Sequence, residues 1–425
     1  MADTIFALSS GRPPAAIAVI RLSGPLAHDA ARTLAGSLPE ARTAALRRLR
    51  HPRSGDMLDD ALVLRFDGRA SSTGEDSVEL HCHGGRAVID AVLAALDEVQ
   101  GLRVAAPGEF TRRAFENGRI DLTEAEGLAD LLEAETETQR KAALAVAEGG
   151  LRKQIEVWQD AVLSLCAEAE RAIDYDEDNV PLDPMLLRKC RELAAQFGEW
   201  LARPRIERLK DGVRVVVAGP PNAGKSSLIN AIAGEERAIV TDVPGTTRDH
   251  IEVPLSLGGV PILLTDTAGL RATDDQVEAI GVERAVKLVE AADILVWLGE
   301  PYDVPDHVRL IEVHARADQA DRAITPAGSL AVSSVTHAGV KQLLERIEAL
   351  ARSLVPAEDQ IALNRRQAAL IDNARDALDA AALATDLVVV AEGLRQARVA
   401  LDRLTGRAGV EELLDSLFGR FCLGK

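Results

Sequence analysis

The chain has 425 residues, which is enough for about three domains of ordinary size, each with an apolar core. Its 49 Lys and Arg residues against 67 Asp and Glu residues give a net charge of −18, which excludes a protein that coats nucleic acid nonspecifically, because that role needs a basic surface. A hydrophobic content of 47% with 27% charged residues excludes wholesale disorder.

The four cysteines are scattered and form no CxxC pair, which favours a reducing compartment over a disulfide framework or a zinc ribbon. No stretch approaches about 18 uncharged apolar residues, and the start MADTIFALSS lacks the basic region of a secretion signal. These features predict a cytoplasmic protein that is not bound to a membrane.

Short β-branched runs alternate with turn signals in the first part of the chain. Strands are predicted over 17–22, 61–66 and 77–83, because each run ends at a glycine-containing turn. A helix is predicted over 87–96, where the apolar spacing becomes helical. The first domain is therefore expected to be a compact α/β unit spanning residues 1–118.

Apolar residues take up helical spacing beyond this first domain. Thr123 and Glu126 have the form of a capping box, which predicts one helix from there to the glycine pair at 149–150. Two more helices are predicted around 155–165 and 186–201. This segment is typical of a helix bundle.

The character of the sequence changes twice more. An apolar run over 213–218 begins alternating strands and helices that continue to about residue 352, and helical spacing then returns. The simplest account is one helical domain, residues 119–210 and 353–425, interrupted by an α/β domain inserted at residues 211–352.

The inserted domain opens with a phosphate-binding signature. The sequence GPPNAGKS at 219–226 matches GxxxxGK[ST], follows the predicted strand 213–218 and precedes a predicted helix at 227–232 that Gly234 closes. Backbone amides and the helix N-terminus favour phosphate there. We expect Lys225 to reach the β- and γ-phosphates and Ser226 to ligate Mg²⁺.

Two further segments follow the P-loop in the order that is typical of the switch regions of a GTPase. The apolar run 262–264 leads to Asp266-Thr267-Ala268-Gly269, where the carboxylate can hold the Mg²⁺ shell and the Gly269 amide can meet a γ-phosphate. The polar loop 241–249 lies between this segment and the P-loop, and its Thr247 could close on Mg²⁺ in the triphosphate state.

Five segments together resemble the family of tRNA-modification GTPases called MnmE or TrmE: GPPNAGKSS, GTTRD, DTAGLR, PGEFTRRAF at 107–115 and the terminal FCLGK at 421–425. The resemblance covers essentially the whole chain. It implies an α/β plus α fold: an N-terminal α/β folate-binding and dimerisation domain, a discontinuous helical domain, and an inserted Ras-like G domain.

The resemblance also implies an activity. Members of the family are potassium-dependent GTPases that act with MnmG, a flavoprotein using FAD and NADH. Together they add an aminomethyl or carboxymethylaminomethyl group to C5 of the wobble uridine of certain tRNAs. A homodimer, a heterotetramer with MnmG, and 5-formyltetrahydrofolate or a related tetrahydrofolate as one-carbon donor are implied as well.

Site residues are implied by motif. The expected K⁺ ligands are Asn222, Thr241, Val243 and Thr246, and the expected Mg²⁺ ligands are Ser226 and Thr247. Glu278 is expected to orient the attacking water and to act with Lys225 in catalysis. The expected folate contacts are Arg21, Glu79, Arg119 and Lys425. The residues expected to contact GTP are Asn222, Ala223, Gly224, Lys225, Ser226, Ser227, Thr241, Asp242, Val243, Pro244, Gly245, Thr246, Thr247, Asp266, Thr267, Ala268, Gly269, Asp318, Ser333 and Ser334.

Physical chemistry makes these roles reasonable. Leu270-Arg271 directly follows DTAG, with no Gln there to align water, so a carboxylate further along the second switch must do so. A monovalent cation beside the β/γ bridge can supply the charge that an arginine finger gives elsewhere. Arg248 and Arg271 could be such fingers, but salt bridges within the switch loops are the favoured interpretation. Cys422 could be a catalytic thiol, but a packing role is favoured.

One departure concerns guanine recognition. The family's NKxD pattern is replaced by Ala315-Arg316-Ala317-Asp318, and Ser333-Ser334 is expected to replace the base-contacting SA loop. Asp318 can still accept hydrogen bonds from guanine, but Ala315 lacks the amide that would bond N7 and brace the P-loop. We expect weaker nucleotide affinity with guanine preference largely kept.

Two alternatives stay open at this point. A ribosome-assembly GTPase of the Era or Der type shares GxPNxGKS and the switch loops, but an Era-like protein would carry a basic KH-type domain after the G domain. A regulatory switch without intrinsic turnover would show no acceleration by K⁺ over Na⁺.

The segment His81-Cys82-His83 could suggest a metal site, but strand alternation should place its members on opposite faces.

Overall fold

The computed structural model describes residues 3–174, 182–235, 252–267, 286–300, 303–322, 324–357, 360–408, 411–419, 421 and 424. The chain divides into two compact units. The N-terminal unit comprises Met1–Ala129 and Asp402–Lys425, and the central unit comprises Asp130–Leu401. Among the described helices, none combines the length and the apolar character that a membrane span requires.

The N-terminal unit is built on a six-stranded sheet in the order β3-β4-β5-β2-β1-β6. Its strands are β1 (Thr4–Leu8), β2 (Ile17–Ser23), β3 (Ala45–Arg50), β4 (Met57–Phe66), β5 (Ser77–His83) and β6 (Leu102–Val104). Neighbouring strands are antiparallel except for the parallel pair β1–β6. The three strands predicted from turn signals are therefore confirmed.

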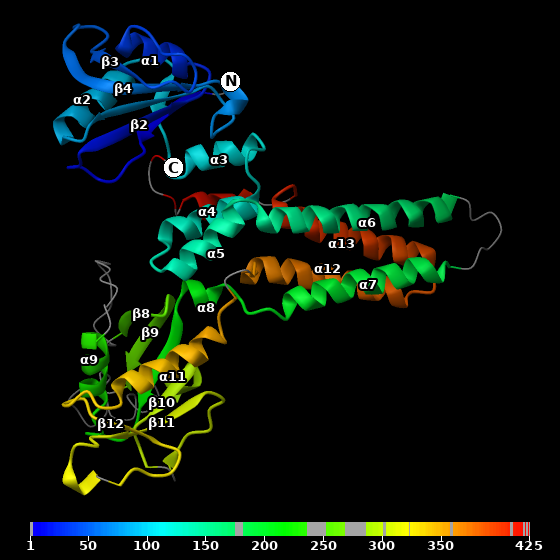
Figure 1. Ribbon diagram of the computed structural model, residues 1–425. Coiled ribbons are helices and arrows are strands. Elements are labelled where there is room, and N and C mark those ends of the chain that lie inside the picture. Colours follow the sequence, from blue (N-terminus) through cyan, green and yellow to red (C-terminus); the bar gives the residue numbers. More distant parts are fainter. Residues whose placement is uncertain are drawn as a thin grey trace, which may run out of the picture. The chain divides into compact units, whose positions relative to one another are not determined.

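Helices α1 (Ala27–Ala35) and α2 (Arg86–Asp97) cover one face of this sheet (Figure 1). Alternate residues of the strands, such as Ile20, Val63 and Leu80, point into the core beneath these helices. On the opposite face, Ile5 and Ala7 pack against Phe110 of helix α3 (Glu109–Glu116). The alternating pattern of the strands thus reflects one face that is buried and one that is partly open.

The start of α4 (Leu122–Glu133), the end of α13 (Leu387–Thr405) and α14 (Glu411–Phe418) complete the N-terminal unit. The start of α4 packs with α14, and the residues that form this small core are Leu122, Ala125, Leu414, Phe418 and Phe421. The helix α13 ends at Gly406, which has a positive φ of 83° as a helix-terminating glycine should.

The helix predicted from Thr123 to the glycine pair is in fact two helices, α4 and α5 (Glu137–Ala147). Thr136 begins the second helix with a capping box of its own, in which Gln139 is the N3 residue. The first cap was also misplaced: Asp121 accepts from the Glu124 amide at 2.9 Å, and the Glu124 carboxylate accepts from the Asp121 amide at 2.7 Å. Asp is as good a cap as Thr, so the helix begins earlier.

The central unit contains the second sheet, in the order β12-β11-β10-β7-β9-β8. Its strands are β7 (Val213–Ala218), β8 (Glu252–Leu257), β9 (Val260–Asp266), β10 (Ile294–Trp297), β11 (Leu310–Ala315) and β12 (Leu330–Val332). All neighbours are parallel except β8, which runs antiparallel to β9. The nearly continuous apolar sequence of β7 fits a central parallel strand that is covered on both faces.

Helices α9 (Lys225–Glu235) and α11 (Val340–Arg352) contribute apolar side chains to the main core of this sheet. The helix predicted over 227–232 therefore begins two residues earlier, inside the P-loop motif, and continues through Gly234. This placement brings the helix N-terminus directly to the phosphate-binding loop.

Long helices form the rest of the central unit: α6 (Gly150–Asp174), α7 (Pro184–Leu201), the short α8 (Glu207–Lys210), α12 (Arg365–Leu383) and most of α13. In Figure 1 the helices α6, α7, α12 and α13 lie side by side. Trp158 is fully buried between Phe197 and Trp200, with ring centroids 4.9 and 5.2 Å apart in edge-to-face geometry. A helical segment interrupted by an α/β domain is the predicted fold class, which the structure confirms.

Candidate functional site

The P-loop lies between the end of β7 and the start of α9, as the sequence predicts. Gly219 has φ of 148°, and a Cβ there would come within 3.1 Å of the Leu298 backbone. Gly224 has φ of 98°, and Asn222 adopts φ of 62° although it is not a glycine. The left-handed conformation costs a non-glycine residue roughly 1 kcal/mol, so the loop holds Asn222 in a strained shape.

Lys225 and Ser226 are the chemically active side chains of this loop. Lys225 is buried, and its ammonium donates to the carbonyls of Gly219 and Pro220, both at 2.8 Å. The Ser226 hydroxyl donates to the Asp266 carboxylate at 2.6 Å. Two residues that lie 40 apart in sequence thus meet where a divalent cation held by phosphates would be expected.

Strand register explains this meeting. Asp266 is the last residue of β9, where it pairs with Val217 near the end of the parallel strand β7. The neighbouring Thr267 donates its hydroxyl to the Val217 carbonyl at 3.0 Å. Because parallel strands end at the same edge of the sheet, DTAG begins beside the P-loop. The described part of the site therefore has the arrangement of a nucleoside-triphosphate pocket.

The altered base-recognition segment follows β11. Arg316 has φ of 60°, and its guanidinium donates a hydrogen bond to the backbone carbonyl of Asn222. Asp318 is exposed, which leaves its carboxylate accessible to a base. Ser333 is buried, and its hydroxyl accepts from the amides of Val335 at 3.3 Å and Thr336 at 3.1 Å. Ser334 is half-buried beside it.

Several expected site residues lie outside the described part of the chain, so their roles stay predictions. They are Thr241, Asp242, Val243, Pro244, Gly245, Thr246, Thr247, Ala268, Gly269, Glu278 and Lys425, together with Arg248, Arg271 and Cys422.

In the N-terminal unit, the structure brings Arg21 and Glu79 together. They pair across β2 and β5, and the Arg21 guanidinium donates twice to one Glu79 oxygen, at 3.1 and 2.9 Å. The other Glu79 oxygen lies 3.1 Å from Nε2 of His81, and the guanidinium sits 5.7 Å from the Phe110 ring centroid. Burial acts to raise the pKa of Glu79, but the His81 and Arg21 contacts outweigh it and hold that pKa below its ordinary value.

The chain end comes back to the end of β1, the strand beside β2. The Ser9 hydroxyl donates to the Gly424 carbonyl at 2.7 Å, and a Cβ on Gly424 would lie 2.0 Å from the Leu8 carbonyl oxygen. Leu8 pairs with Ile20, the residue next to Arg21. Arg119, by contrast, is exposed and packs its stem near Gly74; among the described contacts, none joins it to Arg21 or Glu79.

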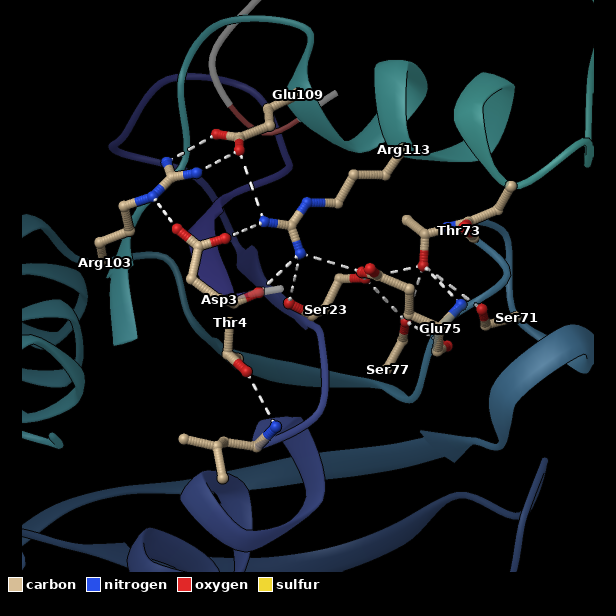
Figure 2. Close-up of polar contacts among 12 residues, drawn as sticks. Asp3, Thr4, Ser23, Ser71, Thr73, Glu75, Ser77, Arg103, Glu109 and Arg113 are labelled. Atoms are coloured by element: carbon tan, nitrogen blue, oxygen red, sulfur yellow. Dashed lines mark hydrogen bonds and ion pairs between the residues drawn. The ribbon is translucent and has the colours of Figure 1, made fainter. Parts of the chain in front are cut away.

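A charged network that sequence reasoning missed surrounds the buried Arg113 (Figure 2). Its guanidinium donates to Asp3 at 2.6 Å and to Glu75 at 3.0 Å. The Arg103 guanidinium donates two hydrogen bonds to the Glu109 carboxylate, at 2.5 and 2.9 Å, and one to Asp3 at 2.5 Å. The network ties α3 to β6, to the start of β1 and to the loop before β5. The sequence feature that pointed to this network is the PGEFTRRAF motif, in which Arg113 is the second of the two adjacent arginines.

The possible metal motif His81-Cys82-His83 behaves as strand alternation predicts. Cys82 is buried in the core, and burial raises the pKa of its thiol to about 12. His81 lies on the opposite face beside Glu79, and Nδ1 of the exposed His83 bonds Asp59 at 2.7 Å. The contacts of these three residues therefore support a structural role for the segment.

A second group of possible ligands also has protein partners. His28, Asp67 and Asp76 place ligand atoms within 4.8 Å of one another. However, Arg65 donates to both oxygens of Asp67, and the Gly68 amide donates to Asp76 at 2.7 Å. The protein itself therefore compensates much of the negative charge of this group.

Comparison with known proteins agrees with this geometry. The family model for the MnmE helical domain matches residues 122–422, and the model for the GTP-binding protein TrmE N-terminus matches residues 4–119. Relatives named tRNA modification GTPase MnmE from Rhizorhabdus wittichii and Erythrobacter litoralis are each 53% identical over 100% of this chain, covering 97% and 100% of the relatives. The relative of that name from Zymomonas mobilis is 49% identical over 99% of this chain and 100% of its own.

Among solved structures, the G domain of the T. maritima FeoB iron transporter aligns with 33% of this chain and 98% of its own length, at 26% identity and a TM-score of 0.25. The family models and full-length relatives set aside the ribosome-assembly alternative. The chain belongs to the MnmE (TrmE) family of tRNA modification GTPases.

Proposed function

We propose that this chain is a K⁺-stimulated GTPase whose cycle drives modification of the wobble uridine of certain tRNAs. It works in the cytoplasm with an MnmG-type flavoprotein that uses FAD and NADH, and it adds an aminomethyl or carboxymethylaminomethyl group at C5. A tetrahydrofolate such as 5-formyltetrahydrofolate donates the carbon. The observation that carries the proposal is the P-loop in which Lys225 and the Ser226–Asp266 pair converge.

GTP binding follows from that arrangement. The start of α9 and the glycine-shaped loop offer amides and positive potential to phosphates. Lys225, which is satisfied by two loop carbonyls here, turns to the phosphates when they arrive. Ser226 and Thr247 would ligate Mg²⁺, with Asp266 holding the Ser226 hydroxyl in place. Glu278 then orients the attacking water.

Asn222, Thr241, Val243 and Thr246 would hold the cation. Its charge stabilises the transition state in place of an arginine finger. Turnover therefore requires that the loop carrying the last three ligands closes, and we expect pairing of two G domains to favour that closure.

The N-terminal unit holds the folate. Arg21 and Glu79 supply a guanidinium and an ionised carboxylate on the face of the sheet away from α1 and α2, and Gly424, the residue before Lys425, contacts the end of the neighbouring strand β1. Arg119 completes the proposed set from the far end of α3.

The same face supports a homodimer. Ile17, Leu46 and Leu62 are apolar and lie 58%, 63% and 45% exposed on it, and Leu46 pairs directly with Leu62. Exposed apolar side chains on one face are a common mark of a protein interface. Two copies joined there can bind two MnmG-type partners to form a heterotetramer. With a net charge of −18, tRNA must be held by local arginines and by that partner.

The test is GTP turnover in KCl and in NaCl at equal ionic strength, with Asn222→Lys as the control. We expect turnover to rise at least about tenfold in KCl for the native chain. In Asn222→Lys the fixed ammonium occupies the cation's place, so we expect the difference between salts to vanish. Equal native rates in the two salts would sink the cation mechanism.

A further inference from the structure

The strand β3 and the turns beside it form a basic segment in an acidic chain. Residues 41–55 contain five arginines and no Asp or Glu, although the whole chain has 67 acidic residues and a net charge of −18. β3 is the first strand in the sheet order, so β4 is its one neighbour in the sheet as described. Positive charge that is concentrated at one edge attracts polyanions even to a protein of negative net charge.

Three arginines of this segment are held in place without a carboxylate partner. The Arg47 guanidinium donates to the carbonyls of Ser37 and Leu46, at 3.0 and 2.9 Å. Arg42 and Arg50 each donate to one backbone carbonyl at 2.9 Å. Among the contacts described for this chain, none joins these three guanidiniums to an acidic side chain. A guanidinium has five N–H donors, so each of them keeps free donors and its charge for a ligand.

The other two arginines of the segment pair with carboxylates. Arg48 lies 3.1 Å from Asp60, and Arg53 lies 3.3 Å from Glu98. Charged residues on an edge strand also prevent pairing with the edge of another chain, but that effect does not require guanidiniums anchored to backbone carbonyls. An anionic ligand therefore explains the unpaired arginines better than protection of the edge does.

Strand geometry keeps this edge clear of the proposed dimer contact and close to the proposed folate contacts. Arg47 pairs with the buried Ala61, so its side chain points to the opposite face of the sheet from Leu46. Glu79 is aligned with Leu64 of β4 and, through β4, with the residue before β3. Two strand spacings put the edge roughly 10 Å from Glu79. A nucleic acid strand held along β3 can therefore extend to the folate pair on the same sheet.

We propose that the basic edge, defined by Arg42, Arg47, Arg50 and Arg69, binds the phosphate backbone of the tRNA substrate. Arg69 is exposed beside Ala70, whose carbonyl anchors Arg42, and adds a fourth positive charge. The inference rests on the proposed function, which requires a tRNA close to the folate site. Arginine suits this partner, because its planar guanidinium can donate two parallel hydrogen bonds to one phosphate. Such contacts fix the position of a nucleic acid without reading its sequence.

The test follows binding of a fluorescently labelled tRNA transcript to the full chain by anisotropy over a range of KCl concentrations. The edge variant Arg47→Gln/Arg50→Gln is compared with Arg188→Gln/Arg395→Gln, which removes two exposed arginines that pair with carboxylates on α7 and α13. Both double variants have the same net charge, so a difference between them reports position and not total charge.

The edge variant should bind tRNA at least about tenfold more weakly at about 0.1 M salt. The slope of log affinity against log salt concentration should fall by roughly 1.4–1.8, because each lost phosphate contact removes about 0.7–0.9. The control variant should keep the native slope and an affinity within about twofold of the native value.

A third variant separates loss of binding from loss of folding. Arg69→Gln changes an exposed side chain for which the structure describes no contact, so the fold does not depend on it. It should bind tRNA about fivefold more weakly, with a slope lower by about 0.7–0.9. Circular dichroism should be native for Arg69→Gln, and a native affinity in this variant would contradict its place in the basic edge.

Two outcomes would overturn the inference. One is equal affinity and slope in the edge variant and the control. The other is binding to vesicles of anionic lipid that the edge variant loses while its tRNA binding stays native, because the edge would then dock on a lipid surface. GTP turnover decides the proposed function separately, and it should be unchanged in all three variants because the P-loop belongs to the other unit. A native chain with K⁺-stimulated turnover that binds no tRNA would overturn this inference alone.

Discussion

At the scale of single residues, the contact between Ser226 and Asp266 makes a direct prediction. Removing the hydroxyl in Ser226→Ala removes a proposed Mg²⁺ ligand and the 2.6 Å hydrogen bond to Asp266. We expect turnover of GTP to fall by roughly a hundredfold, and the Mg²⁺ concentration for half-maximal turnover to rise. The measurement is a Mg²⁺ titration of GTP turnover. Ser353→Ala, on an exposed serine after α11, is the control, and an unchanged Mg²⁺ requirement in Ser226→Ala would contradict the assignment.

Arg113 makes a second prediction at this scale, on the stability of the N-terminal unit. It is only 8% exposed and holds two carboxylates, Asp3 and Glu75, at once (Figure 2). In Arg113→Met, Glu75 loses its cationic partner while the half-exposed Asp3 keeps Arg103, so we expect a loss of about 2–3 kcal/mol. Urea unfolding followed by circular dichroism measures the loss. The exposed Arg32→Met on α1 should cost less than about 1 kcal/mol.

The same network predicts how stability depends on pH. A hydrogen bond from Arg103 lowers the pKa of Asp3 below its ordinary 3.8, against the opposing effect of burial. Burial acts to raise the pKa of Glu109, but Arg103, the Ala106 amide and Arg113 bring it below its ordinary 4.5. These carboxylates therefore stabilise the fold fully above about pH 4.5, and that stability is lost as pH falls through the lowered values.

Urea unfolding at pH 5.5 and at pH 3.5 tests this dependence. The native chain should lose more stability between these pH values than Arg103→Gln, which keeps a polar side chain with the same stem as far as Cδ but removes the charge. Equal losses in the two proteins would show that the Arg103 contacts do not lower these pKa values.

At the scale of elements, α5 depends on its cap. The Thr136 hydroxyl accepts from the backbone amide of Gln139, and the Gln139 side-chain oxygen accepts from the backbone amide of Thr136. The Gln139 side-chain amide also donates to the Leu209 carbonyl at 3.0 Å. We expect Thr136→Ala to lower the free energy of unfolding of the central unit by about 1 kcal/mol and Thr136→Ser by less than half of that. All three tryptophans lie in this unit, so their fluorescence in urea reports the change. Equal losses in the two variants would argue against the cap.

The elements also show where sequence patterns suffice. The strand β7, with its nearly continuous valines, and the strands β2 and β5, with their alternation, were predicted because burial on one or both faces leaves a regular trace. The break between α4 and α5 was missed because the apolar spacing continues across it. What ends the first helix is the local cap at Thr136, a short-range preference that periodicity does not contain.

At the scale of the whole molecule, the motifs predicted which segments meet but not every residue that joins them. The meeting of Ser226 with Asp266 follows from two motifs on neighbouring parallel strands. The contact of Arg316 with Asn222 could not be predicted, because it depends on a side-chain direction set by a left-handed backbone 94 residues further along the chain. A long-range contact of this kind leaves no local pattern, even when both residues lie in motifs.

The chain end offers the last prediction, because residues 415 positions apart meet where Ser9 bonds the Gly424 carbonyl at 2.7 Å. If the tail completes the folate site, releasing it should weaken folate binding even when Lys425 is still present. We expect Ser9→Ala and Lys425→Ala each to weaken binding of 5-formyltetrahydrofolate about tenfold, which corresponds to about 1.4 kcal/mol. Titration calorimetry gives both this affinity and that for GDP, which should stay unchanged because the P-loop belongs to the other unit. If Lys425→Ala weakens folate binding and Ser9→Ala does not, the lysine binds folate without help from the Ser9 contact, and the tail's docking on β1 serves stability alone.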